Sequence, residues 1–196
     1  MVEDFITILY PLLPVVHLPS FRLALVEDRA STDPIFFSLL TSICAQTAVL
    51  LPRRFLEYRS SSDVFPYNTP AEFVHRCIDI ILPLRDSTYF ETSSPEKAAV
   101  AYTLGYASSV AGIKGRSLLF WTELGTILKD AGIHDPASHD GWNCIELQLW
   151  KKLFWMWFII EACAPLPNRF LSLTVAKTCS SWLRKAKGFD EVEAHP

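Results

Sequence analysis

The sequence has little net charge. Its 18 lysines and arginines stand against 21 aspartates and glutamates, which gives a formal net charge of −3. Proteins that wrap nucleic acid or lie on anionic membranes carry a strongly basic face. The nearly neutral balance therefore excludes a chain whose main surface is built for either of these partners.

Closely spaced cysteines are also lacking. The five cysteines stand at positions 44, 77, 144, 163 and 179, too far apart for a CxxC or zinc-knuckle spacing, and their number is odd. Four of them lie in apolar stretches with a helical pattern, so we expect most to be reduced core residues. The chain opens without the cationic and apolar regions of a secretory signal. We therefore expect an intracellular protein.

The most aromatic stretch is too short to cross a bilayer. Within ELQLWKKLFWMWFIIE, residues 146–161, the unbroken apolar run extends over the eight residues from Leu153 to Ile160. A membrane-spanning helix needs about 20 apolar residues. Lys151 and Lys152 precede the run and Glu161 follows it. We interpret the stretch as a core helix with its aromatic side chains packed inside, and we predict no membrane partner.

Motifs for catalysis and nucleotide binding are absent. The sequence contains no GxSxG, GxGxxG or P-loop motif, and a nucleophile elbow needs a strand-to-helix turn that an all-helical chain does not offer. His17 and His75 have apolar neighbours, which is typical of structural histidines. We predict that the chain is not an enzyme.

Two polar segments leave alternatives open. His134-Asp135 and His139-Asp140 combine residue types that bind divalent metals, but a structural zinc site has four ligands, and a polar turn is the plainer interpretation. Residues 114–117, KGRS, begin a helical pattern and are the nearest approach to an anion site. A turn that faces solvent is the plainer interpretation there. No catalytic or metal-binding residue is predicted, and no cofactor-binding residue can be named.

The sequence does contain a series of helical patterns separated by proline-marked breaks. Asp33-Pro34, Thr69-Pro70 and Ser94-Pro95 each place a capping side chain before a proline that suits the first helical position. An apolar stripe over 73–82 follows the second of these signals. Three helices are therefore predicted to begin at residues 34, 70 and 95.

Further signals predict how other helices begin, end and pack. Ser20 is a candidate cap for a short helix that ends at Val26. Small residues between Ala98 and Ala111, with Gly105 among them, predict that a neighbouring helix approaches closely. Gly132 is the expected residue beyond the end of a helix over 115–131.

Together these patterns predict an all-α fold, an irregular array of about six or seven helices joined by short loops. We expect one domain over residues 1–163. Residues 164–196 lose clear periodicity and end in mixed charge. We expect them to form a divergent, partly disordered tail with weak helix between residues 171 and 187.

Three stretches, taken in order, resemble the middle homology region of fungal zinc-cluster transcription factors. YPLLPVVHLPSF at 10–21 is similar to the family's PLLPILHRPSF, and LLTSICAQTAVL at 39–50 is similar to LLxAICALAA. AGIHDP at 131–136 and the stretch 146–161 are similar to LGLHRD and RRRLWWxLYxLDR. The residues on the family's motif positions are Pro14, His17, Pro19, Phe21, His134, Glu146, Lys151, Lys152 and Trp155.

The sequence also departs from this family. Glu161-Ala162 stands where the family has Asp-Arg, and the family's GRP shortly afterwards is missing. The six-cysteine zinc cluster that contacts DNA in the family is absent, as are the helices that normally follow. We therefore expect a fragment whose regulatory domain is incomplete on its C-terminal side.

The resemblance implies a nuclear regulatory domain that modulates DNA-templated transcription through an attached DNA-binding module. Zinc is then expected only in the missing cluster, and DNA is a partner only through that module. Co-regulators or a second copy of the chain are the other partners it implies. One alternative is a helical protein-interaction scaffold without a transcriptional role. Another is a small-molecule-binding helical domain, which would need a polar pair projecting into an apolar pocket, and the sequence reveals no such pair.

Overall fold

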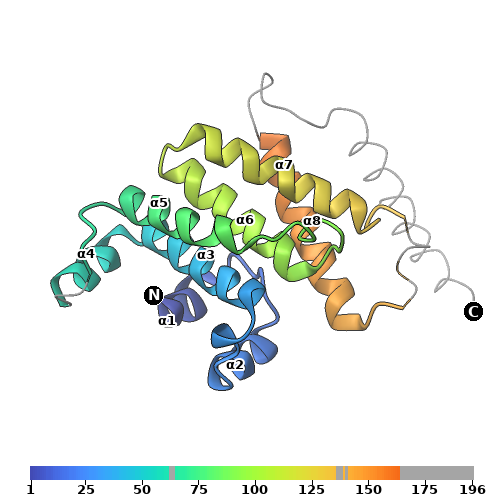
Figure 1. Ribbon diagram of the computed structural model, residues 1–196, viewed down its shortest axis with the longest axis horizontal. Coiled ribbons are helices and arrows are strands. Elements are labelled where there is room, and N and C mark those ends of the chain that lie inside the picture. Colours follow the sequence, from blue (N-terminus) through green and yellow to red (C-terminus); the bar gives the residue numbers. More distant parts are fainter. Residues whose placement is uncertain (62–64, 136–138, 140, 164–196) are drawn as a thin grey trace, which may run out of the picture. The chain divides into compact units, whose positions relative to one another are not determined.

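The structure, a computed structural model, describes residues 1–61, 65–135, 139 and 141–163 (Figure 1). The chain divides into two compact units, Met1–Phe154 and Trp155–Pro196, and each is described by itself. The described residues form eight α-helices and contain no β-strand. The predicted all-α fold is confirmed, with close to the predicted number of helices.

The α-helices follow one another with short connections. They are α1 (Val2–Asp4), α2 (Leu18–Val26), α3 (Pro34–Leu50), α4 (Pro52–Ser61), α5 (Pro70–Ile81), α6 (Pro95–Val110), α7 (Lys114–Asp130) and α8 (Cys144–Cys163). A π-helix (η1, Phe5–Leu9) follows α1, and two 3₁₀ turns (η2, Arg29–Ser31; η3, Leu82–Leu84) precede α3 and follow α5. The boundary between the two units falls inside α8. The predicted tail, 164–196, lies outside the described residues.

The three predicted helix starts are confirmed, because each capping side chain binds free backbone N–H groups of the first turn. The Asp33 carboxylate accepts hydrogen bonds from two such groups in α3, at 2.8 and 3.1 Å. The Thr69 hydroxyl accepts one at 3.1 Å in α5, and the Ser94 hydroxyl accepts one at 3.2 Å in α6. In all three helices a proline occupies the first position.

The predicted start of α2 is wrong by three residues. The helix begins at Leu18 with His17 as its N-cap, in an extended conformation, and it ends at Val26 as predicted. The Ser20 hydroxyl, the expected cap, instead lies 2.8 Å from Nδ1 of His17. Pro19, at the second helical position, has no N–H group for a capping side chain to bind. α2 begins without a side-chain cap.

The core of the first unit is built on α3 and α6. α3 packs against α5 and α6, and α6 also packs against α7, as Figure 1 shows. The predicted close approach is confirmed at Gly105 in α6, where an added Cβ would lie 3.0 Å from ring atoms of Trp121 in α7. Side chains below 2% exposure include Phe36, Ile43, Ile78, Leu104, Phe120 and Leu124. The small residues of α6 therefore let two helices pack on it at once.

Two further pattern-based predictions are confirmed. The stripe on α5 is buried at Val74, Cys77, Ile78 and Ile81. α7 ends at Asp130, and Gly132 follows with a φ of +66°, a left-handed conformation that suits glycine.

The aromatic stretch 146–161 lies in α8, as predicted. In the first unit, Trp150, Leu153 and Phe154 are at most 4% exposed. In the second unit, the rings of Trp155 and Phe158 meet edge to face at 5.6 Å. In the part of the chain that the structure describes, no single helix is long and apolar enough to cross a membrane; α3 and α4 pass that test only as a pair, and they bend by 110° at their junction.

A buried ion pair ties the loop after η3 to α7. Nη1 of Arg85 donates a 2.6 Å hydrogen bond to Oε2 of Glu123, whose side chain is only 4% exposed. The guanidinium also lies over the rings of Tyr89 and Phe120, at 4.8 and 5.5 Å from their centroids. Burial raises the pKa of Glu123 above its ordinary value, although the Arg85 charge opposes this.

The same loop is tied to α6 by a buried ammonium group. Lys97 is 4% exposed, and its Nζ donates to the carbonyl oxygens of Tyr89 and Thr92, both at 2.6 Å. It also lies 4.9 Å from the centroid of the Tyr89 ring. The lysine thus replaces the water that these two carbonyls would otherwise bind.

The cysteines with described side chains are free thiols. Burial raises the pKa of Cys44 to about 11 and that of Cys77 to about 12, so both remain protonated near neutral pH. Cys144 differs from the expected core position, because it is exposed at the start of α8.

Candidate functional site

The segment that carries four of the family-motif residues, 14–21, forms one wall of a cavity. Pro14 and His17 are half-buried, Pro19 is exposed, and Phe21 is 3% exposed. The Phe21 ring lies 5.7 Å from that of Phe36 in α3. The segment therefore holds α2 against the core, and the polar N-terminal end of α2 faces the cavity.

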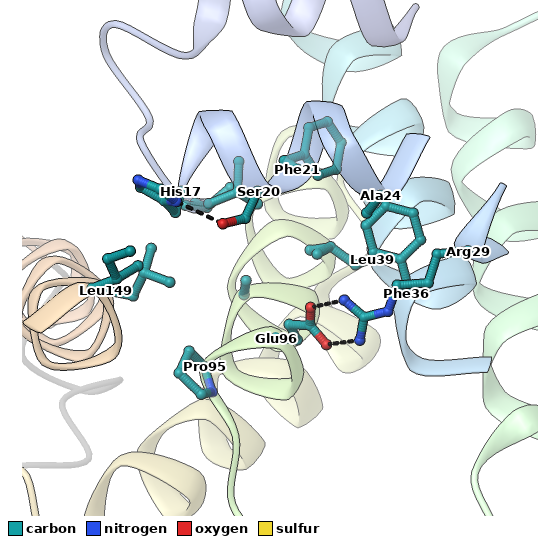
Figure 2. Close-up of a pocket in the computed structure, with 14 residues that line it drawn as sticks. His17, Ser20, Phe21, Ala24, Arg29, Phe36, Leu39, Pro95, Glu96 and Leu149 are labelled. Carbon is teal, nitrogen blue, oxygen red and sulfur yellow. Dashed lines mark hydrogen bonds and ion pairs between the residues drawn. The ribbon is translucent and has the colours of Figure 1, made fainter. Parts of the chain in front are cut away.

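This first cavity has a volume of about 110 Å³. Its walls come from the segment before α2, from α2 itself, from α3, from the first turn of α6 and from the first turns of α8, as Figure 2 shows. Most of the lining is apolar: Val15, Val16, Phe21, Ala24, Phe36, Leu39, Pro95, Ala99, Ile145 and Leu149. The polar residues are His17, Ser20, Arg29 and Glu96. An apolar interior with a few polar groups is typical of small-molecule sites.

A second cavity of about 290 Å³ adjoins the first. The two share His17, Ile145 and Leu149 as walls, and the second adds Cys144, Gln148 and Lys152 from α8. All of these residues belong to the first unit. Both cavities are lined mostly by apolar surface, and the second adds the polar side chains of Gln148 and Lys152. The first is called the inner cavity and the second the outer cavity.

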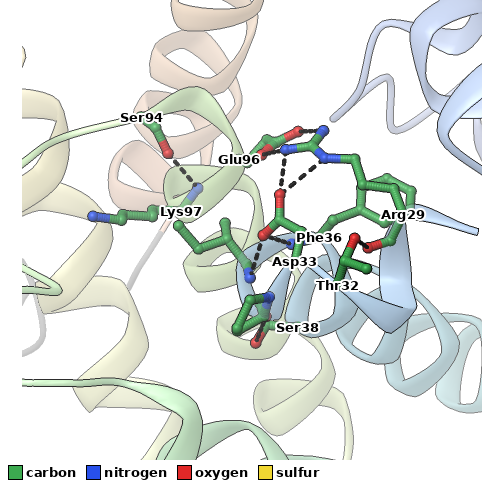
Figure 3. Close-up of polar contacts among 10 residues, drawn as sticks. Arg29, Thr32, Asp33, Phe36, Ser38, Ser94, Glu96 and Lys97 are labelled. Carbon is green, nitrogen blue, oxygen red and sulfur yellow. Dashed lines mark hydrogen bonds and ion pairs between the residues drawn. The ribbon is translucent and has the colours of Figure 1, made fainter.

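A three-residue, partly exposed network lies on the side of the first cavity away from Leu149, as Figure 2 shows for Arg29 and Glu96. The guanidinium of Arg29 donates two hydrogen bonds to the Glu96 carboxylate, at 2.8 and 3.0 Å, and two to Oδ2 of Asp33, at 2.9 and 2.6 Å. Figure 3 shows the network, and Figure 2 shows the two bonds to Glu96. All three nitrogens of the guanidinium are thus engaged, and the network carries one net negative charge when both carboxylates are ionised.

The network shifts the pKa values of its members. The hydrogen bond to Glu96 is the main reason that the pKa of Arg29 is raised. For Asp33, burial alone would raise the pKa, but the Phe36 and Ile35 N–H groups and the Arg29 guanidinium together lower it below its ordinary value. Both groups therefore remain charged at neutral pH.

A polar pair at this site was not found in the sequence. Nδ1 of His17 and Oγ of Ser20 lie 2.8 Å apart at the cavity wall, where Figure 2 shows them opposite Leu149. The third alternative for the function required such a pair in an apolar pocket. The two residues are only three apart in the chain, but the opposite wall of the cavity comes from α8, more than a hundred residues further along, so the sequence did not place the pair at a pocket.

The motif residues on α8 and before it are placed differently from one another. Lys152 is exposed and lines the second cavity with His17. Glu146 and Lys151 are half-buried, and the backbone N–H of Glu146 is capped by the Asn143 side chain at 2.9 Å. His134 is exposed beyond the end of α7. The structure therefore brings Lys152 together with His17, while His134 lines neither of the two cavities.

The polar segment around His134 and His139 provides no assembled metal site in the described part of the chain. Among the described residues, no group of three His, Cys, Asp or Glu side chains could hold a metal ion. Asp140, one of the four residues considered, lies outside the described residues. The His139 ring stacks on Trp142 with centroids 5.2 Å apart.

The alternative anion site at the start of α7 has its polar groups engaged elsewhere. Arg116 forms an ion pair with Asp79 at 3.7 Å, and the Ser117 hydroxyl lies 2.6 Å from that of Ser109. Lys114 is exposed. These contacts favour a structural turn that joins α7 to α5 and α6.

Comparisons with protein-family models, with curated proteins and with solved structures gave no match for this chain.

Proposed function

We propose that residues 1–163 form a regulatory domain of the kind found in fungal zinc-cluster transcription factors, acting in the nucleus through an attached DNA-binding module. The observation that carries the proposal is the order of the three motif stretches at 10–21, 39–50 and 131–161. The all-α architecture of the described residues is compatible with it.

The placement of the motif residues supports the proposal. The PLLPVVHLPSF segment packs Val15, Val16 and Phe21 into the core, and its His17 occupies the N-cap position of α2. LLTSICAQTAVL lies on α3, where Leu39, Ile43 and Ala45 are at most 2% exposed. The motifs therefore coincide with positions that organise the domain, which is how a recurring sequence pattern specifies a fold.

The expected action is on an attached module and does not require catalysis. In such an arrangement the domain changes the output of a DNA-binding protein through contacts with co-regulators or with a second copy. Any zinc would be held by the attached cluster. DNA would be contacted only by that cluster, since this chain has a net charge of −3.

A reporter assay tests the proposal. The full chain is fused between an unrelated DNA-binding domain and a strong activation domain in a fungal cell, and reporter output is compared with that of a fusion carrying an unrelated helical domain of similar size. We expect the chain to change reporter output by several-fold and the fusion to concentrate in the nucleus. Phe21→Asp, which places a charge in the core, should abolish the effect, and Arg22→Asp on the exposed face of α2 should not.

Purified chain supplies the second test. We expect no sequence-preferring shift of a CGG-repeat duplex at physiological salt. A reporter unaffected by the chain, or a specific shift by the chain alone, would contradict the proposal; the first result would favour the helical interaction scaffold.

A further inference from the structure

We infer that the two adjoining cavities between α2 and α8 form a binding site for a small aliphatic carboxylate. The apolar chain of the ligand occupies the inner cavity, and its carboxylate lies in the outer cavity beside Lys152 and His17. The inference deepens the proposed function, on which its regulatory meaning rests; the binding itself is a property of the purified chain.

The inner cavity selects an apolar group of limited size. Its lining is dominated by the aliphatic and aromatic side chains of the α2 segment, α3 and α8, with Phe21, Leu39 and Leu149 among them. A cavity of about 150 Å³ holds benzene, so the 110 Å³ here has room for roughly four to five carbon atoms. The short apolar tail of an aliphatic acid fits this space.

The outer cavity is mostly apolar but contains groups that would bind a negative head group. Lys152 supplies a full positive charge, and Gln148 and His17 supply hydrogen-bonding groups. Among the residues that line this cavity there is no acidic side chain. A carboxylate placed here would meet a lysine ammonium, and charge-assisted hydrogen bonds of this kind are the stronger ones.

The side of the inner cavity beside Arg29 determines the orientation of the ligand. The Arg29 guanidinium is fully engaged by Glu96 and Asp33, and the network carries net negative charge. An anionic head group would be repelled there, whereas a methyl terminus would not. The two ends of the site therefore differ in sign, and this difference points the carboxylate outward toward α8.

Hexanoate is the probe, with hexanamide and hexylamine as neutral and cationic analogues of the same length. Binding to the full chain is measured by ligand-observed NMR titration. A second readout is the rate of Cys144 alkylation by iodoacetamide, followed by peptide mass spectrometry, because this exposed thiol lines the outer cavity. We expect hexanoate to bind saturably, to bind about tenfold more tightly than either analogue, and to slow alkylation of Cys144.

Three variants locate the site. Lys152→Met should weaken hexanoate binding by about fivefold, as expected for one partly exposed charge contact, and should leave hexanamide binding unchanged. Leu149→Trp should block the inner cavity and abolish binding of both probes. Lys129→Met, which removes an exposed lysine at the end of α7, is the matched control and should change neither. Circular dichroism checks that each variant is folded.

The inference is overturned if hexanoate binds no more tightly than hexylamine, if folded Lys152→Met binds it as well as the unchanged chain does, or if no saturable binding is found. Should Leu149→Trp fail to fold, the Lys152→Met result and the protection of Cys144 still decide the matter. Because no reporter is involved, failure here leaves the transcriptional proposal standing. A chain that binds hexanoate without affecting a reporter would support the site and contradict that proposal.

Discussion

Gly105 in α6 and the indole of Trp121 in α7 are in such close contact that a single added methyl group would lie 3.0 Å from the ring atoms Cδ2 and Cε2. The indole is held in place, since its Nε1 donates a 3.2 Å hydrogen bond to the Ser109 hydroxyl and its ring meets that of Tyr102 edge to face at 5.6 Å. Gly105 therefore sets the spacing between α6 and α7.

Gly105→Ala should destabilise the protein despite the better helix propensity of alanine. The overpacked interface costs about 1–3 kcal/mol, which exceeds the gain of about 1 kcal/mol from replacing a helical glycine. Urea unfolding followed by circular dichroism measures the difference. Gly115→Ala in α7 is the control, because no atom lies within 4 Å of its added Cβ, and it should be neutral or stabilising.

Arg85→Met should cost about 3–5 kcal/mol at neutral pH, because it leaves the Glu123 carboxylate buried without its cation. The double variant Arg85→Met/Glu123→Met should recover most of this loss, since it removes the stranded charge. Chemical denaturation of the single variants and of the double variant measures this coupling.

The cost of Arg85→Met should shrink in acid. The pKa of Glu123 is raised by burial above its ordinary value of 4.5. A carboxyl group whose pKa is higher in the folded than in the unfolded protein stabilises the fold at a pH below its unfolded-state pKa. This stabilisation is lost as the pH rises through the folded-state pKa. The variant should therefore regain stability relative to the unchanged protein as pH falls toward 4.5. A loss that is independent of pH would contradict this explanation.

Lys97→Met should release the loop between η3 and α6. The substitution keeps the apolar stem but leaves the carbonyls of Tyr89 and Thr92 without their donor, which costs about 1–3 kcal/mol for a buried acceptor. Amide hydrogen exchange should accelerate over residues 86–93 before it does elsewhere. Lys129→Met, at an exposed position, should stay within about 0.5 kcal/mol of the unchanged protein.

Asp33→Asn should reveal an acid-dependent contribution from the network. Asparagine still caps α3 but loses the ionic contact with Arg29, a loss of about 0.5 kcal/mol for a partly exposed pair. The folded pKa of Asp33 lies below its ordinary value of 3.8. The stabilisation from the ionised Asp33 side chain is therefore present at a pH above 3.8 and is lost as the pH falls through the lower pKa of the folded state. Stability curves of the two proteins, measured from pH 7 down to about pH 2, should converge at the acid end.

Local signals in the sequence were sufficient for helix starts and for buried stripes. Asp33, Thr69 and Ser94 act within their own first turns, so their roles depend on three or four neighbouring residues. The start of α2 was missed because Ser20, the expected cap, lies inside the helix, and its hydroxyl is close to the His17 ring. Pro52 follows the end of α3 and begins α4, since proline is compatible with the first helical position.

The site itself could not be predicted, because its parts are far apart in the chain. Ser20 and Glu96 line one cavity with Leu149, and no periodicity within a single segment connects them. Arg85 and Glu123 are likewise far apart in the chain, and their ion pair forms only when α7 packs beside the loop after η3. Two of the motif residues, His17 and Lys152, line the outer cavity, although the motifs did not predict this.

The contact between Arg29 and Glu96 closes a loop of 67 residues, and this length has a consequence for the order of folding. α6 and α7 are joined by a turn of three residues, 111–113, so they meet at little entropic cost, whereas closing the longer loop costs more. We expect the α6–α7 hairpin to form in the transition state for folding and the Arg29 network to form after it. In stopped-flow kinetics, Gly105→Ala should then slow refolding, while Glu96→Gln should mainly accelerate unfolding.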